Sequence, residues 1–135
     1  MGTHLVWIRM DLFRRRGEDI IMALIGNTNA EKIWNFLYSK LNNPYGVAGI
    51  MGNMYAESGL NPKNLQQSYE KKLGYTDESY TKAVDDRIYN NFIYDKAGYG
   101  LVQWTYWSLK KELYNYAIKK GTSIGDLETQ LELLY

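Results

Sequence analysis

The chain contains no cysteine and a single histidine, and these shortages exclude several kinds of chemistry. Without cysteine there is no disulfide, no thiol nucleophile and no cysteine-bound metal. The one histidine, His4, lies in an irregular N-terminal stretch, which argues against a Ser-His-Asp triad and against a histidine-bound zinc. Carboxylates and aromatic side chains remain in quantity, so we expect a function that needs no metal and no other cofactor.

The chain also lacks an excess of charge and a long apolar run. The 16 lysines and arginines stand against 15 aspartates and glutamates, which leaves a net charge of +1 and no general attraction to nucleic acid or anionic membranes. The apolar residues 20–25 are too few to span a bilayer. We therefore predict no nucleic-acid partner and no membrane insertion. A length of 135 residues predicts a single domain.

Residues 1–26 differ in character from the rest of the chain. Their arginines follow the first apolar patch, whereas a secretory signal places its charge first and its apolar run second. We therefore recognise no signal peptide and predict an irregular basic linker or a remnant of a longer reading frame. A basic segment that lies on a membrane surface is the alternative. The folded domain is expected at residues 27–135.

Helical patterns begin at Thr28. Thr28 and Glu31 have the spacing of a capping box, and the apolar residues from Ile33 to Leu41 share one helical face. Asn42-Asn43-Pro44 predicts the end of this helix and the start of another, because proline is favoured in a first turn. Later elements are expected as a turn-rich loop at 60–74, a short extended segment at 88–94, and helices at 76–86, at 108–120 with Leu109 inward, and from 123 onward.

Glu57 stands out because it continues an apolar stripe at helical spacing. The stripe before it consists of Val47, Ile50, Met51 and Met54. Gly59 and Pro62 then predict the end of the helix, with Gly59 suited to a left-handed cap. Partial burial and the helix dipole would both disfavour a charged carboxylate in the last turn, as a general acid requires. The alternative is a surface glutamate at a frayed helix end.

Three glycines lie at close spacing in the same predicted helix. Each of Gly46, Gly49 and Gly52 costs helix stability, roughly 1 kcal/mol relative to alanine. Their smooth row therefore predicts close packing against another helix. We expect a buried central helix that holds Glu57 in position.

A second informative segment, Gly98-Tyr99-Gly100-Leu101-Val102-Gln103-Trp104-Thr105, follows about forty residues downstream. Together with the segment from Gly49 to Pro62, it resembles the phage tail lysozyme family, a branch of the lysozyme and lytic-transglycosylase superfamily. The resemblance covers residues 30–134. It implies a mainly α, α+β lysozyme-like fold, in which a helical bundle surrounds a central helix and a short hairpin or extended segment lines a cleft.

The same resemblance implies roles for individual residues. The Glu57-Ser58 pair would carry the acid, with Ser58 also in contact with the substrate. Gln103 with the backbone around Tyr99 and Gly100 would hold the sugar beside the scissile bond. The aromatic residues Tyr55, Tyr99 and Trp104 are candidates for a stacking surface. Helix packing is the alternative role for Trp104 and for Trp107.

A second catalytic group is less evident. Asp95 precedes the Gly98-Tyr99-Gly100 turn and is a candidate second carboxylate, with turn capping as the alternative. The remaining acidic residues of this region are expected to form a solvated face, and they are Asp77, Glu78, Asp85 and Asp86.

Two departures from the family pattern affect this interpretation. Leu109 stands where relatives usually carry an arginine, and relatives continue with further helices, so we expect a domain truncated at its C-terminal end. The predicted function is cleavage of the bond between N-acetylmuramic acid and N-acetylglucosamine in bacterial peptidoglycan. Hydrolysis is the preferred reaction, and the anhydro-forming reaction of a lytic transglycosylase is the alternative. A cell-wall binding module without catalysis and a structural phage tail component are the alternatives.

The resemblance also indicates where such a protein acts. It would be made in the bacterial cytoplasm and act on the cell wall, as part of a phage tail or as a released lysin. Its partners would be peptidoglycan and other lysin or tail domains.

Overall fold

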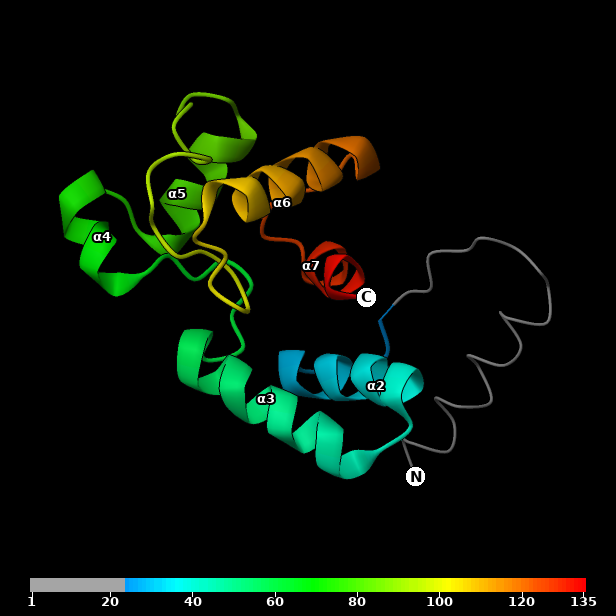
Figure 1. The fold of residues 1–135 in the computed structure, drawn as a ribbon. Coiled ribbons are helices and arrows are strands. Elements are labelled where there is room, and N and C mark those ends of the chain that lie inside the picture. The colour runs from blue at the N-terminus through cyan, green and yellow to red at the C-terminus, as the bar shows by residue number, and fades with distance from the viewer. Residues whose placement is uncertain (1–23) are drawn as a thin grey trace. The chain divides into compact units, whose positions relative to one another are not determined.

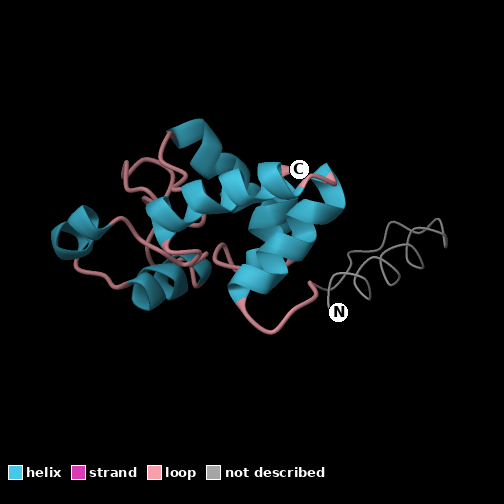
Figure 2. Cartoon of the chain, turned by 90° about the horizontal axis from the view of Figure 1, so that it is seen from below, coloured by secondary structure: helices cyan, strands magenta, loops and turns pink. Residues whose placement is uncertain are grey.

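The computed structural model describes residues 24–135, and these residues are mainly helical. Figure 2 shows helices joined by loops, without a strand in the described part of the chain. The helices are α2 (Asn29–Leu41), α3 (Pro44–Ser58), α4 (Gln67–Leu73), α5 (Asp77–Asp85), α6 (Trp107–Lys120) and α7 (Leu127–Leu134) (Figure 1). The mainly α prediction is therefore confirmed. The prediction for residues 1–26 falls almost entirely outside the described residues.

The described residues belong to two compact units, one that ends at Gly52 and one that runs from Asn53 to Tyr135. The boundary lies within α3, and each unit is described by itself. No helix of residues 24–135 combines the length and the apolar character needed to cross a membrane.

Helix α2 begins as its sequence predicts. The Thr28 hydroxyl accepts a hydrogen bond from the Glu31 N–H at 3.1 Å, which satisfies one of the free donors of the first turn. The Glu31 carboxylate accepts from the Asn27 N–H at 3.0 Å, one residue earlier than in a standard capping box. Ile33 is fully buried, and Asn42 ends the helix with a left-handed φ of 52°.

Helix α3 begins at Pro44, as predicted, but it is not the buried central helix that we expected. Gly49 and Gly52 are exposed, and a Cβ built on either would meet no described atom within 4 Å. Tyr45 and Tyr55 are also largely exposed. The glycine row therefore serves no close packing within the described residues, and the prediction drawn from it is wrong. The buried residues of this helix are Val47, Met54 and Ser58.

An aromatic cluster forms the core of the second unit. Tyr80 of α5 is fully buried, and its ring centroid lies 5.5 Å from that of Tyr99 and 6.0 Å from that of Phe92. Thr76 and Ser79 cap the start of α5 reciprocally, each side chain accepting from the other residue's N–H. Local capping thus places Tyr80 where distant aromatic residues surround it.

Two loop segments meet beside this core. Leu65 pairs with Tyr99, and Tyr99 pairs with Trp104, in isolated antiparallel bridges. The predicted hairpin is therefore present only as these bridges. The extended segment predicted at 88–94 forms no strand, and residues 92–94 form a turn in which the Tyr94 N–H donates to the Asn91 carbonyl at 3.2 Å.

The remaining differences concern helices with weak or shifted patterns. Helix α4 was not predicted; it has no buried residue and no capping side chain, so its sequence carries little periodic signal. In α6, Lys110 is buried and Leu109 is 46% exposed, which reverses the predicted orientation of Leu109. Helix α7, which contacts α6, begins after the capping residue Asp126, later than expected.

Candidate functional site

Glu57 lies in the last turn of α3, as its sequence predicts. The helix ends at Ser58, and Gly59 follows with a left-handed φ of 62°. The Glu57 side chain is exposed, however, and makes no hydrogen bond or ion pair with any described residue. The expected partial burial of Glu57 is therefore wrong. Its position leaves both carboxyl oxygens open to a ligand.

Ser58 connects the end of α3 to the loop of the second sequence segment. Its side-chain oxygen lies 2.8 Å from the Leu101 carbonyl oxygen and 2.9 Å from the Met54 carbonyl oxygen. One hydroxyl hydrogen serves these two acceptors. Because Ser58 is only 6% exposed, its side chain anchors the backbone next to Glu57 and is not open to a ligand.

The loop between Tyr99 and Trp104 is closed by two backbone hydrogen bonds. The Tyr99 N–H donates to the Trp104 carbonyl at 3.0 Å, and the Trp104 N–H donates back at 2.8 Å. Gly100 has a φ of 85°, and a Cβ there would lie 2.9 Å from Oε1 of Gln130. Gly100 is thus required by both its backbone conformation and its surroundings.

Gln130 of α7 holds this loop by hydrogen bonds, and the sequence did not predict this role. Its Oε1 accepts from the Leu101 N–H at 3.0 Å, while its Nε2 donates to the carbonyls of Pro62 and Ile124 at 2.7 and 2.8 Å. The side chain is fully buried with all three bonds satisfied. No local pattern marks a glutamine that has distant backbone partners.

Gln103 holds the same loop from the other end. Its Nε2 lies 3.0–3.1 Å from three acceptors, the Asn64 backbone and side-chain oxygens and the Gly100 carbonyl. These contacts occupy the amide hydrogens. Its Oε1 makes no hydrogen bond with a described residue, and a Cβ at Gly98 would lie 2.7 Å from it. The Gln103 side chain can therefore offer a ligand only an acceptor.

Two of the three predicted stacking residues are buried. Tyr99 has no exposed surface, and its hydroxyl lies 2.6 Å from the Thr81 hydroxyl. Burial raises the pKa of Tyr99 above its usual range. Trp104 is 6% exposed, so it is a packing residue, as the alternative held. Stacking of a sugar on either ring is excluded, and only Tyr55 remains available.

Asp95 is enclosed in a network of hydrogen bonds. Its Oδ1 lies 2.6 Å from Lys110 Nζ, and the two side chains are 1% and 0% exposed. The hydroxyls of Tyr80 and Tyr89 donate to its Oδ2 at 2.6 and 2.8 Å, and the Ala97 N–H donates to Oδ1 at 2.9 Å. This geometry favours the turn-capping role over a second catalytic carboxylate.

The charge of Lys110 is balanced inside this network. Nζ also donates to the Ala97 carbonyl at 2.7 Å and lies 4.3 Å from the centre of the Phe92 ring. Burial lowers the pKa of Lys110, and the neighbouring Asp95 opposes this effect. The ion pair fixes the loop that leads into the Gly98–Trp104 segment.

The other acidic residues of this region also have structural partners. Asp77 is half-buried and accepts from the Leu65 N–H at 2.8 Å, so it does not belong to a solvated face. The other three are exposed, as expected: Glu78 pairs with Lys63, Asp86 with Lys82, and Asp85 accepts from Ser123 and Ile124. Glu57 is thus the predicted site carboxylate that is left without such a partner among the described residues.

Comparison with known proteins identifies the family. The family model described as phage tail lysozyme matches residues 28–135, from the capping residue of α2 through both sequence segments of the candidate site. No curated protein and no solved structure matches the chain. Membership of this family implies an activity that degrades peptidoglycan. Since the match covers well over half of its residues, the chain belongs to the phage tail lysozyme family.

Proposed function

We propose that this protein cleaves the bond between N-acetylmuramic acid and N-acetylglucosamine in peptidoglycan, with Glu57 as the general acid. The observation that carries the proposal is the hydrogen bond from Ser58 to the Leu101 carbonyl, which joins the residue beside Glu57 to the Gly98–Trp104 loop. The last turn of α3 and the Gly98–Trp104 loop are thereby held together within the second unit.

In the proposed reaction, the Glu57 carboxyl group acts first as a general acid and then as a general base. Glycoside cleavage needs a proton on the leaving oxygen while the sugar carbon develops oxocarbenium character. Glu57 has no competing partner among the described residues, so its carboxyl group is free to face the leaving oxygen. After this transfer, the Glu57 carboxylate can accept a proton from the attacking water. This route needs no second carboxylate, which is a requirement for catalysis here because Asp95 is enclosed.

A glycan strand bound over the exposed Glu57 side chain would exclude water from it. In the loop that Ser58 anchors, Gln103 Oε1 can accept a hydrogen bond from an N-acetyl N–H group.

The test compares the wild-type protein with Glu57→Gln and with Glu112→Gln, which changes an exposed glutamate of α6. Each is incubated with purified peptidoglycan, and the soluble fragments are analysed by mass spectrometry. We expect fragments with reducing muramic ends from the wild type and from Glu112→Gln, but none from Glu57→Gln. Equal cleavage by Glu57→Gln would refute the assignment, and anhydro ends would indicate transglycosylation instead of hydrolysis.

The alternative function is that of a cell-wall binding module without catalysis. The observation in its favour is that Asp95, the candidate second carboxylate, is enclosed by its partners. A binding module would co-sediment with cell walls and release no fragments. A structural tail component would do neither.

A further inference from the structure

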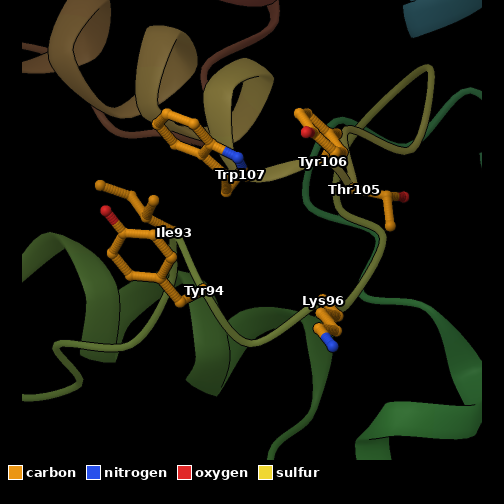
Figure 3. Close-up of a pocket in the computed structure, with 6 residues that line it drawn as sticks. All are labelled: Ile93, Tyr94, Lys96, Thr105, Tyr106 and Trp107. Atoms are coloured by element: carbon orange, nitrogen blue, oxygen red, sulfur yellow. The ribbon is translucent and has the colours of Figure 1, made fainter.

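A groove of about 400 Å³ opens beside the start of α6, apart from Glu57 and the Ser58 anchor. Its lining consists of Ile93, Tyr94, Lys96, Thr105, Tyr106 and Trp107. Figure 3 shows these side chains around an open space, with Tyr106 and Trp107 across from Tyr94 and Lys96. All six residues belong to the second unit.

Three aromatic side chains in the groove are exposed, although aromatic side chains are usually buried in the core. Tyr94, Tyr106 and Trp107 are 62%, 63% and 45% exposed. The rings of Tyr94 and Trp107 lie 6.2 Å apart at an interplanar angle of 24°, and those of Tyr106 and Trp107 lie 6.1 Å apart. The faces that these rings leave exposed are flat and apolar, which suits the apolar face of a pyranose ring.

One positive charge accompanies these rings. Lys96 is exposed and forms no ion pair with a described residue, and its backbone has a left-handed φ of 63°. Nearby, the carboxylate of Asp95 is occupied by Lys110, so it does not neutralise Lys96. A ligand that carries a carboxylate beside a sugar ring would complement this groove.

The walls of the groove are held by the elements that shape the candidate site. The Asp95–Lys110 pair fixes the wall that carries Tyr94 and Lys96. On the other wall, the Thr105 hydroxyl donates to the Gln103 carbonyl at 2.9 Å. Through Thr105, this wall of the groove is tied to the backbone of the loop that carries Gln103.

We propose that this groove is a binding subsite for peptidoglycan, in which a sugar ring stacks on Tyr94 and Trp107 while Lys96 pairs with a carboxylate of the attached peptide. The inference rests on the proposed function for its substrate class. In this proposal, the groove contributes to the affinity for peptidoglycan and takes no part in the proton transfer at Glu57.

The experiment measures binding of two probes to the Glu57→Gln protein, which prevents turnover. One probe is a neutral N-acetylglucosamine oligomer, and the other is a disaccharide with its peptide stem. Dissociation constants are compared for Trp107→Ala, Tyr94→Ala and Lys96→Gln, each in the Glu57→Gln background. Tyr45→Ala, a change of a tyrosine that is 88% exposed and lies outside the groove, is the control. Thermal unfolding confirms that each variant is folded.

We expect Trp107→Ala and Tyr94→Ala to weaken binding of both probes by roughly 3- to 10-fold. Lys96→Gln should weaken binding of the peptide-bearing probe alone, by roughly 2- to 5-fold, and the effect should shrink at high salt. Tyr45→Ala should bind as the parent does. Unchanged binding of both probes by folded Trp107→Ala and Tyr94→Ala would overturn the subsite.

The outcome separates this inference from the proposed function. If the wild type cleaves peptidoglycan and the groove variants bind both probes normally, the subsite is wrong and the function stands. If the groove variants lose binding but Glu57→Gln still cleaves the wall, the subsite stands and the role of Glu57 is wrong. If Lys96→Gln weakens both probes equally, the carboxylate pairing is wrong.

Discussion

The hydroxyl oxygen of Ser58 lies 2.8 Å from the carbonyl oxygen of Leu101, 43 positions later in the chain. This contact joins the last turn of the helix that carries Glu57 to the loop that carries Gln103. Ser58 was predicted to contact substrate, and its burial gives it an anchoring role instead. Ser58 thus helps to fix the position of the backbone that carries Glu57 relative to the loop that carries Gln103.

Replacing Ser58 by alanine should loosen this anchor. The buried Leu101 carbonyl would lose a donor, which we expect to cost about 1–3 kcal/mol of unfolding free energy. Wall-cleaving activity should fall further than the loss of folded protein explains. Urea denaturation and turbidity assays measure both, with Ser68→Ala, which changes an exposed serine, as the control. Wild-type stability in Ser58→Ala would contradict the anchoring role.

Gly100→Ala should destabilise the loop for two separate reasons. The new Cβ would require a strained φ near 85° and would lie 2.9 Å from Gln130 Oε1. Gly121→Ala is the matched control, because its φ is 71° but nothing lies within 4 Å of the new Cβ. We expect Gly121→Ala to cost about 1 kcal/mol and Gly100→Ala about 2–4 kcal/mol. Equal losses by chemical denaturation would show that Gln130 moves aside.

Lys110→Met should be among the most damaging single changes in the second unit. It leaves the buried Asp95 carboxylate without its cation, for which we expect a loss of about 3–5 kcal/mol. The double variant with Asp95→Asn should recover part of this loss, since it removes the unpaired charge. Lys111→Met, at an exposed position, is the control in urea denaturation. A double variant as unstable as Lys110→Met would argue that packing of the lysine stem dominates.

Glu128 should make stability depend on pH in the acid range. Its Oε1 is buried without a hydrogen bond, and burial, with a smaller effect of Glu132, raises the pKa of Glu128 from its usual 4.5. A carboxyl whose pKa is raised on folding stabilises the protein below its unfolded pKa, and this contribution is lost as pH rises through the folded pKa. Glu128→Gln should therefore raise Tm at pH 7, by roughly 1–3 °C for a half-exposed group, and should have little effect near pH 3.

Calorimetry at the two pH values checks this expectation. Glu112→Gln, at an exposed position, should shift Tm little at either pH. A lower Tm for Glu128→Gln at pH 7 would mean that the charged form of Glu128 stabilises the fold.

The residues of the candidate site show how far sequence reasoning reached. The position of Glu57 in a last turn was correctly predicted, because Gly59 and Pro62 signal a helix end locally. The exposure of Glu57 was not predicted, because helical spacing does not reveal whether other segments cover the face of α3 that carries Glu57. Tyr99 and Trp104 were assigned to ligand stacking, but distant residues such as Tyr80 and Thr81 bury the Tyr99 ring.

Local sequence signals were enough to predict where most of the helices in residues 24–135 begin and end, and two motifs were enough to indicate the family. Capping by Thr28 and Thr76 and left-handed ends at Asn42 and Gly121 act over a few adjacent residues, so they can be read from the chain. The accessibility of individual side chains could be read only from the folded chain. Asp95 became half of a buried ion pair and Trp107 part of an open groove, because burial depends on segments that the fold brings from elsewhere in the chain.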